Sequence, residues 1–367
     1  MENSSHRELR FRGESPIPEV MAELTAALVG TGPALCFAPM SNPRVPRPVA
    51  IVVATSGSTG ISKEVGITAS ALLASAKASN EFLGAKYGQV WSLLLPLTHV
   101  AGINVLVRSL ALGTTPIDLR NTSEYSKVDF TAIVPTQLFR ALNGDEALLN
   151  HLKSCRAVLV GGAALSDSMR QAAANAGIEI ITTYGMTETC GGCVYNGTPI
   201  SGVEVDASNG AIRIKGPTIA HSYLNDAQAW RDSFVEGWFL TKDLGTVVDG
   251  RLIVSGRADD VIISGGENVS LSAIESALHK AFKENEFAAF SIPDAEWGSA
   301  LHIAIAGDHP ISTHEISLYL ENTLGAVAKP KGFLILSELP MIGIGKVDQK
   351  ALAQAVLERK ALVDDFT

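Results

Sequence analysis

The feature that most constrains the fold is a loop rich in glycine and hydroxyl side chains that directly follows an apolar run. The loop covers residues 55–63 and reads TSGSTGISK, and residues 49–54 before it have the β-branched composition of a buried strand. Glycine permits tight turning, consecutive backbone N–H groups form a concavity for anions, and Lys63 adds a positive charge. The Walker P-loop is excluded, because two residues separate Gly60 from Lys63 and Glu64 stands where Ser or Thr is required. The sequence therefore predicts another kind of phosphate loop, with a Ser/Gly linker as the alternative.

Strand patterns and helix patterns alternate on both sides of this loop. Buried strands are expected at residues 91–95, 156–162 and 178–183, and helices at residues 17–30, 69–83, 105–112 and 166–176. Such alternation predicts a parallel α/β sheet with its ligands at the carboxyl ends of the strands. We also expect the helix at 69–83 to begin where the phosphate loop ends, so that its dipole favours phosphate.

From residue 198 onward the chain becomes rich in short alternating runs that glycine, asparagine and aspartate separate. The length of 367 residues favours about two domains. We predict an α/β and α+β protein: a large N-terminal domain with layered sheets and helices, residues 1–257, and a small mobile α+β C-terminal domain, residues 258–367.

Composition narrows the class of protein. Hydrophobic residues make up 46% and charged residues 18%, as in globular proteins with a large core. The net charge of −9 argues against a nucleic-acid partner. Residues 1–20 contain no apolar segment of the secretory kind, and no apolar run has the length of a membrane span. The expectation is a cytoplasmic protein without membrane insertion.

Five further motifs follow the loop in order. They are PLTH with His99, YGMTE at 184–188, GWFLTKD with Asp243, GRADD with Arg257 and Asp259, and GKV with Lys346. With the loop, they resemble the signatures of the adenylate-forming enzymes: acyl- and aryl-CoA synthetases, luciferases and peptide-synthetase adenylation domains. Two residues depart from the family pattern, because Ser62 replaces a proline and Lys242 replaces a glycine. The 54 residues before the loop are also far fewer than is usual in that family.

The resemblance implies ATP, Mg²⁺ and coenzyme A as cofactors and assigns roles to named residues. The phosphate loop would hold the pyrophosphate through Thr55, Ser56, Gly57, Ser58, Thr59, Gly60 and Lys63. Gly161, Gly162 and Ala163 would line the adenine, on which Tyr184 stacks beside Gly185. Thr187 would contact the α-phosphate, and Glu188 would bind Mg²⁺, for which a hard carboxylate is suited.

The remaining roles fall in the last third of the chain. Asp243 would accept the ribose hydroxyls, and Arg257 would contact ribose or phosphate. Asp259 would be the hinge between the domains, Gly265 and Gly266 would face coenzyme A, and Lys346 would be the catalytic lysine.

A single arginine bears on the choice of substrate. Arg108 lies in an otherwise apolar helical stretch, where an unpaired charge is costly. It snorkels toward solvent, pairs with a carboxylate of the protein, or binds an anionic ligand. In the last case it would hold a second carboxylate of the substrate, which a guanidinium matches bidentately. The pattern PLxHxxGxxxLxRSL, followed by IVPTQL at 133–138, resembles the o-succinylbenzoate–CoA ligases of menaquinone biosynthesis. That resemblance implies an aromatic dicarboxylate substrate, with His99, Ala101, Asn104 and Arg108 in its pocket.

Several alternatives stay open at this point. They are another aryl- or acyl-CoA ligase with a monocarboxylic substrate, a stand-alone adenylation enzyme that loads a carrier protein, and a non-catalytic remnant that binds nucleotide. Cys190 and Cys193 have C-x-x-C spacing, for which metal or redox chemistry is weighed against two incidental cysteines. Since a short N-terminal portion could expose apolar surface, a homodimer is a further expectation.

Overall fold

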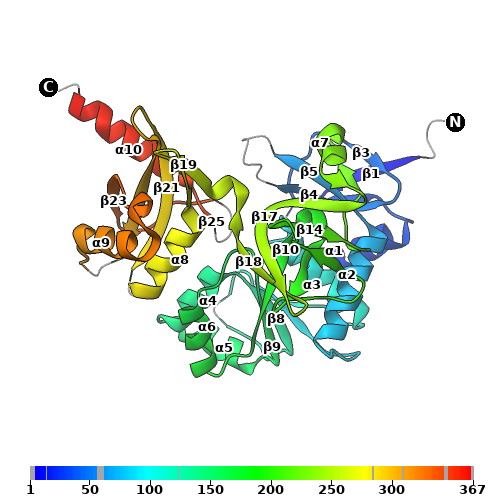
Figure 1. Ribbon diagram of the computed structural model, residues 1–367. Helices are drawn as coiled ribbons and strands as arrows, with labels where there is room; N and C mark the ends of the chain where they lie inside the picture. Colours follow the sequence, from blue (N-terminus) through cyan, green and yellow to red (C-terminus); the bar gives the residue numbers. More distant parts are fainter. Residues whose placement is uncertain are drawn as a thin grey trace. The chain divides into compact units, whose positions relative to one another are not determined.

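The computed structural model describes residues 5–13, 15–55, 62–122, 124–282, 285–307, 310–342 and 346–364 (Figure 1). The contacts between residues divide the chain into two units. The first contains Met1–Gly162, Ala172–Thr241 and Val247–Ile253, and the second contains Ala163–Gln171, Lys242–Thr246 and Val254–Thr367. No helix in the described ranges combines the length and the apolar composition that crossing a membrane requires.

The first sheet of the first unit carries the start and the end of the phosphate loop. Its strand order is β15-β5-β4-β2-β1-β3, in which β4 pairs in parallel with β2 and antiparallel with β5. The strands are β1 (His6–Phe11), β2 (Ala34–Cys36), β3 (Arg44–Pro46), β4 (Val49–Thr55), β5 (Lys63–Thr68) and β15 (Ser222–Tyr223). Val49 to Val53 of β4 are buried, which confirms the strand expected there.

The second sheet has the order β12-β11-β10-β9-β8-β6-β7. Strands β10, β9, β8, β6 and β7 are mutually parallel, and β11 and β12 run antiparallel at one edge. The strands are β6 (Trp91–Leu93), β7 (Ile117–Asp118), β8 (Phe130–Ile133), β9 (Ala157–Val160), β10 (Ile180–Met186), β11 (Gly191–Tyr195) and β12 (Thr198–Pro199). The parallel sheet that the alternating pattern predicts is thus confirmed.

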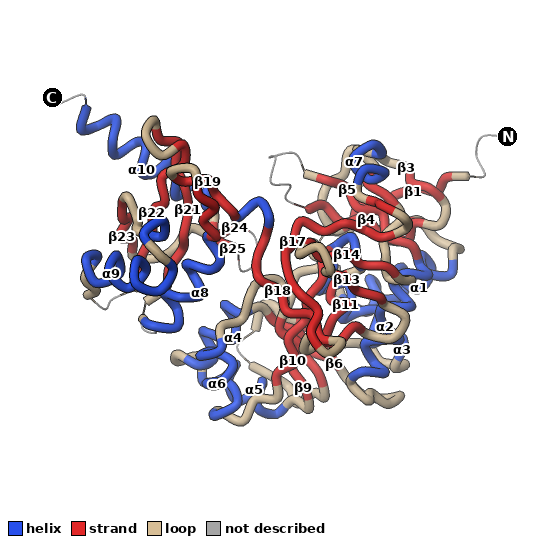
Figure 2. Tube along the Cα trace, in the orientation of Figure 1, coloured by secondary structure: helices blue, strands red, loops and turns tan. Residues whose placement is uncertain are grey.

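Helices pack between these two sheets and beside the second (Figures 1 and 2). Helix α2 contacts β4, β5 and α3, and α3 contacts β6, β8 and β11. The helices of the first unit are α1 (Ile17–Val29), α2 (Ala69–Phe82), α3 (Val100–Ala111), α4 (Pro135–Leu142), α5 (Glu146–Ser154) and α7 (Ala227–Asp232). Helix α1 ends at Gly30, whose φ of 80° is the left-handed conformation that favours glycine, as the sequence predicts.

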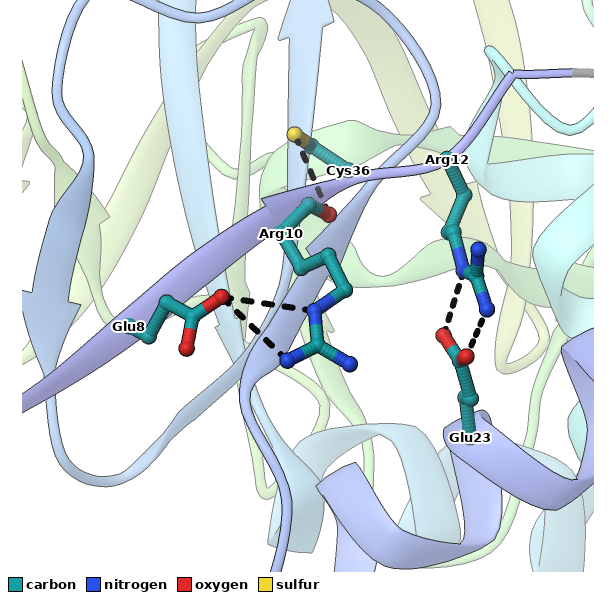
Figure 3. Close-up of polar contacts among 5 residues, drawn as sticks. All are labelled: Glu8, Arg10, Arg12, Glu23 and Cys36. Atoms are coloured by element: carbon teal, nitrogen blue, oxygen red, sulfur yellow. Dashed lines mark hydrogen bonds and ion pairs between the residues drawn. The ribbon is translucent and has the colours of Figure 1, made fainter.

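Polar side chains fasten β1 to its neighbours (Figure 3). Arg12, just beyond β1, forms a two-point ion pair with Glu23 of α1. The Cys36 thiol of β2 donates to the Arg10 carbonyl at 3.6 Å. The Arg10–Glu8 pair at 3.3 Å is exposed, so it contributes little to stability.

A third sheet follows the second. It contains β13 (Glu204–Asp206), β14 (Ala211–Lys215), β17 (Trp238–Val248) and β16 (Phe234–Val235) in that order, and β18 (Arg251–Arg257) also pairs with β17. Strands β17 and β18 contribute residues to both units. Helix α6 (Asp167–Asn175) likewise belongs to both. Its cap is Ser166, because the Ser166 hydroxyl accepts from the Met169 amide.

The second unit contains a sheet of order β20-β19-β22-β21, with β23 parallel to β22. Its strands are β19 (Val261–Ser264), β20 (Glu267–Ser270), β21 (Glu286–Asp294), β22 (Gly298–Ala306) and β23 (Gly332–Leu336). Apolar faces of α8 (Leu271–Ala281) and α9 (Thr313–Leu324) cover it in one buried cluster. A short ladder joins β24 (Met341–Ile342) to β25 (Lys346–Val347), before α10 (Gln349–Asp364). These elements make the α+β unit that the sequence predicts.

One prediction about the phosphate loop is wrong. Strand β5 lies between the loop and α2, so the loop connects two antiparallel strands instead of leading into a helix. The reason is the β-branched composition of the short run Val65–Thr68, which pairs with β4 and keeps its side chains buried. The dipole of α2 is therefore no part of the loop's affinity for phosphate.

Candidate active site

The described part of the site begins at the stem of the phosphate loop. Thr55 and Lys63 face each other across β4 and β5, and the Ser62 hydroxyl donates to the Thr55 carbonyl at 2.9 Å. Asn225 spans the end of the loop, since its Nδ2 donates to the Ser62 carbonyl at 2.8 Å and its Oδ1 accepts from the Glu64 amide at 3.0 Å. Ser56, Gly57, Ser58, Thr59 and Gly60 lie outside the described residues.

Lys63 and Glu188 are far apart in the sequence, and both contact the same tyrosine, Tyr223. The Lys63 Nζ atom lies 4.2 Å from the centroid of the Tyr223 ring. The Tyr223 hydroxyl donates to Glu188 Oε1 at 2.7 Å. Tyr223 is 3% exposed, and burial followed by the charge of Glu188 raises the pKa of its hydroxyl above the usual 10. The phenol therefore stays protonated and remains a donor to the carboxylate.

The YGMTE segment forms the end of β10 and a short 3₁₀ turn. The pairing of β10 with β11 is irregular between Tyr184 and Gly185, and a Cβ at Gly185 would overlap the Gly191 carbonyl. The turn Thr187–Thr189 follows, and the Glu188 carbonyl accepts from the Ala220 amide at 2.8 Å. This bulge requires glycine at position 185 and redirects the chain, so that Glu188 faces Tyr223.

Gly161 and Gly162 follow β9 at the carboxyl end of the parallel sheet, and Gly161 lies against Thr183 of β10. Gly161 follows β9, and a Cβ there would overlap Thr183 Oγ1 of the neighbouring β10. Gly162 has a φ of 89°. Gly161 thus leaves no room for a Cβ beside Thr183, and the backbone of Gly162 favours glycine. Two residues without side chains also suit the close approach of a flat ligand. Ala163, the next residue, is exposed.

Helix α3 carries the residues expected in the acyl pocket. His99 is the half-buried residue that precedes its first turn, and Ala101 is partly exposed. Asn104 is buried, and its Nδ2 donates to the Cys190 carbonyl at 2.7 Å, which brings α3 against the start of β11. Its Oδ1 has no hydrogen-bond partner among the described residues.

Arg108 is buried without a carboxylate partner in the described ranges. Its Nη2 donates to the Tyr195 hydroxyl at 3.0 Å, and Tyr195 in turn donates to Ser79 Oγ at 2.9 Å. The guanidinium carbon lies 5.2 Å from the Trp91 ring centroid. Arg108 is 4% exposed, so the carboxylate pairing that the sequence left open is replaced by neutral partners.

Several buried polar atoms around Arg108 lack a partner among the described residues. They belong to Arg108 itself or to residues on the same helix or in contact with it, and are Arg108 Nε, Asn104 Oδ1, Ser109 Oγ, Trp91 Nε1 and Asn80 Oδ1. Buried polar atoms are normally hydrogen-bonded, so such a cluster fits a place where a polar ligand or water completes the bonds.

The two cysteines of the C-x-x-C spacing are buried thiols. Burial raises the pKa of Cys190 and of Cys193 to about 12. Cys190 takes a left-handed φ of 58° at the end of the 3₁₀ turn. The described residues contain no group of three or more His, Cys, Asp or Glu side chains that could hold a metal by themselves.

The second unit contains the remaining expected residues. Asp243 is buried and pairs with Arg257, whose Nη1 lies 3.3 Å from Asp243 Oδ1. Gly265 and Gly266 form the exposed turn between β19 and β20, with φ angles of 60° and 85°. The backbones of Asp259 and Lys346 lie in a 3₁₀ turn and in β25, and their side chains are outside the described set.

The geometry fits a magnesium–nucleotide complex better than a free metal ion. Tyr223 occupies one oxygen of Glu188, and the other has no partner among the described residues. One carboxylate oxygen suits Mg²⁺, which keeps few protein ligands and takes the rest from phosphate and water. Lys63 supplies a cation close by, as phosphate binding requires. Tyr223, Asn225 and Tyr195 are absent from the sequence prediction, because no local pattern links them to the motifs they contact.

Comparison with known proteins gives one family. The family model described as AMP-binding enzyme matches residues 7–224. A probable 2-succinylbenzoate–CoA ligase of Mycobacterium tuberculosis is 35% identical over 95% of this chain and 98% of its own length. The 2-succinylbenzoate–CoA ligase of Listeria monocytogenes is 30% identical over 83% of this chain and 70% of its own.

A solved structure resembles most of the chain. It is the o-succinylbenzoate CoA synthetase of Bacillus subtilis in complex with its acyl-adenylate intermediate, with a TM-score of 0.72 and 28% identity. The match covers 85% of this chain and 70% of that one. The same enzyme has been solved with ATP and a magnesium ion, at a TM-score of 0.72.

Proposed function

Since the chain belongs to the family of AMP-binding enzymes, we propose that it joins 2-succinylbenzoate (o-succinylbenzoate) to coenzyme A at the expense of ATP. The products are the acyl-CoA thioester, AMP and pyrophosphate, and the reaction belongs to menaquinone biosynthesis. ATP, Mg²⁺ and coenzyme A are the cofactors that this ligase reaction uses. The observation that carries the substrate is Arg108, a buried cation without a protein carboxylate in the described residues.

The first half-reaction is attack of the substrate carboxylate on the α-phosphate of ATP, which releases pyrophosphate. Here the protein's task is to position groups and to neutralise charge. Lys63 and the phosphate loop hold the leaving pyrophosphate, and Glu188 binds Mg²⁺, which neutralises phosphate charge. Tyr184 provides an aromatic face for adenine, and Thr187 a hydroxyl for the α-phosphate.

The substrate has two carboxylates, and only one is activated. We place the other against Arg108, because a guanidinium matches a carboxylate bidentately and the Arg108 Nε–H lacks a partner among the described residues. Asn104 and His99, on and just before α3, line the same pocket.

In the second half-reaction the thiol of coenzyme A attacks the acyl-adenylate and expels AMP. Lys346 acts only in the first step in this proposal, and the domain at 258–367 turns about Asp259 to present Gly265 and Gly266 for the second. Asp243 and Arg257 keep their assignment to the ribose and phosphate of the nucleotide.

The substrate is tested by pyrophosphate release with ATP and Mg²⁺ across 2-succinylbenzoate, benzoate and fatty acids. Selective turnover of 2-succinylbenzoate, with transfer to free coenzyme A, is the expected result. Turnover of monocarboxylic acids alone would replace the substrate but keep the reaction. Adenylation without transfer to coenzyme A would favour a carrier-loading enzyme, and absence of turnover with any acid would favour a non-catalytic nucleotide-binding protein.

Two further proposals concern the setting of the enzyme. Its use of ATP and coenzyme A supports the cytoplasm as its place. Large apolar side chains are exposed on the N-terminal helices, namely Val29, Leu73 and Phe82, and they support a homodimer. Light scattering after size-exclusion chromatography tests the dimer, which a monomer at micromolar concentration would refute.

A further inference from the structure

We propose that Tyr223 is a positioning residue that contacts both Lys63 and Glu188 and keeps them from pairing with each other. Lys63 is then free to contact the phosphates of a magnesium–ATP complex, and Glu188 its Mg²⁺. This inference rests on the proposed function, in which Lys63 binds phosphate and Glu188 binds Mg²⁺. Tyr223 itself stands outside the motifs that define the family signatures in this chain.

The first argument concerns charge. A direct ion pair between Lys63 and Glu188 would neutralise both groups, and none is present between these two described side chains. Instead, the Tyr223 hydroxyl satisfies Glu188 Oε1 at 2.7 Å, and the ring supports the Lys63 ammonium at 4.2 Å. A cation on an aromatic face is held more weakly than one paired in a buried salt bridge. Lys63 thus remains available to phosphate and Glu188 to a metal.

The second argument concerns the carboxylate. Because Tyr223 engages Oε1 of Glu188, the carboxylate cannot rotate freely, and its second oxygen is presented in one direction. Mg²⁺ demands near-ideal octahedral geometry, so a fixed ligand oxygen favours it over a rotating one. Supporting residues that orient a metal ligand typically change metal affinity 10- to 100-fold when they are removed.

The third argument concerns rigidity. Tyr223 belongs to β15, which pairs with β5 in the register Tyr223–Val65, two residues beyond Lys63. The Leu224 amide donates to the Glu64 carbonyl at 2.7 Å, and the Trp230 ring of α7 meets the Tyr223 ring edge-on at 5.0 Å between centroids. The tyrosine is therefore held beside the strand that carries Lys63, and its hydroxyl restrains the position of Glu188 relative to that strand.

The test is Tyr223→Phe, which keeps the ring under Lys63 and removes the hydroxyl that donates to Glu188. ATP binding is measured by calorimetry across a series of Mg²⁺ concentrations, without any acid substrate. We expect the variant to need about tenfold more Mg²⁺ for half-maximal ATP affinity. Its ATP affinity in excess EDTA should equal that of the wild type. The matched control is Tyr87→Phe, the same chemical change at a side chain that is 84% exposed, and it should alter neither quantity.

A double-mutant cycle shows whether Tyr223 acts through Glu188. The Mg²⁺ dependence of Tyr223→Phe combined with Glu188→Gln should match that of Glu188→Gln alone, because the second change has already removed the group that Tyr223 positions. Equal Mg²⁺ dependence of Tyr223→Phe and wild type, or additive effects in the cycle, would overturn the inference but not the proposed function. Failure of the wild-type chain to bind ATP at any Mg²⁺ concentration would overturn both.

Discussion

Arg108→Met distinguishes an arginine that anchors the substrate from an arginine that only stabilises the fold. Loss of an anchor lowers substrate binding with little effect on stability, whereas loss of a structural arginine does the opposite. Methionine is unbranched, flexible and uncharged, so it fills the space of the arginine stem but not that of the guanidinium. The substitution removes the bond to Tyr195 at 3.0 Å and the contact with the Trp91 ring at 5.2 Å. It also removes a charge that is 4% exposed and has no protein carboxylate beside it in the described ranges.

The effect on stability should be small, because its parts offset one another. The lost hydrogen bond of a charged donor contributes about 1.5–3 kcal/mol. The lost cation–π contact contributes about 2 kcal/mol in a desolvated place. Against these stands the desolvation of an ion, which costs several kcal/mol when no opposite charge compensates it. The free energy of unfolding of Arg108→Met should therefore lie within about 2 kcal/mol of the wild type.

The effect on substrate binding should be large. Truncating one partner of a buried, hydrogen-bonded charge pair costs about 2–5 kcal/mol, since the remaining charge is left unpaired. Taking about 3 kcal/mol, kcat/KM for 2-succinylbenzoate should fall about 150-fold. The KM for ATP should not change, because no described contact links Arg108 to Lys63, Tyr223 or Glu188.

Urea unfolding and steady-state pyrophosphate release measure the two quantities on the same preparation. Arg156→Met is the matched control: this arginine is exposed, its guanidinium lies 5.9 Å from the Phe130 ring, and its loss should leave kcat/KM unchanged. A variant of Arg108 that loses more than about 3 kcal/mol of stability while its kcat/KM stays constant would refute the anchoring role. Arg108 would then serve only to stabilise the fold.

Three further changes test other parts of the molecule. Gly185→Ala should cost more than about 2 kcal/mol of unfolding free energy, since its Cβ would overlap the Gly191 carbonyl, whereas Gly13→Ala, with no atom within 4 Å of its Cβ, should be nearly neutral in urea titrations. Burial raises the pKa of Glu275 from 4.5 to about 7, so the native state binds this proton more tightly and unfolding free energy falls as pH rises from about 4.5 to 7. Glu275→Gln should remove that slope and be more stable than wild type at pH 8 by about 3 kcal/mol, but nearly equal to it at pH 4.5; a constant difference would contradict the assignment. Lys346→Ala should lose most adenylate formation yet retain thiolysis of supplied acyl-adenylate, and equal loss in single-turnover assays of both steps would refute the division of labour.

The elements that the sequence predicts well are those with a strong local period. Helix α1 shows the helical spacing of Val20, Leu24 and its terminal glycine, and β4 is a continuous β-branched run. Strand β5 escaped prediction because it is only six residues long and starts with a charged pair, Lys63 and Glu64. Its strand character comes from its antiparallel pairing with β4, a contact that the residues of β5 alone do not reveal.

Glu64 illustrates a second limit of local patterns. In the sequence it is the residue that breaks the Walker pattern, and nothing near it suggests a partner. In the structure it is 6% exposed, and its Oε1 accepts from the Ser41 hydroxyl at 2.7 Å. This charge stabilises the approach of a preceding loop to β5, a tertiary contact between positions 23 residues apart.

The residues that would touch ligand are predictable for a reason that does not extend to the residues that hold them. A phosphate needs cations and amides, a metal needs a carboxylate, and a purine needs an aromatic face, so ligand chemistry restricts the residue types at those positions. The residues that position these ligand-binding groups depend instead on which segments the fold brings together. Asn225 fixes the loop through the Ser62 carbonyl across 163 positions, and at Ser62, where the family has proline, a hydroxyl closes the stem by donating to Thr55. This side-chain bond restrains the chain at the stem of the loop, at a position where a proline would instead fix φ.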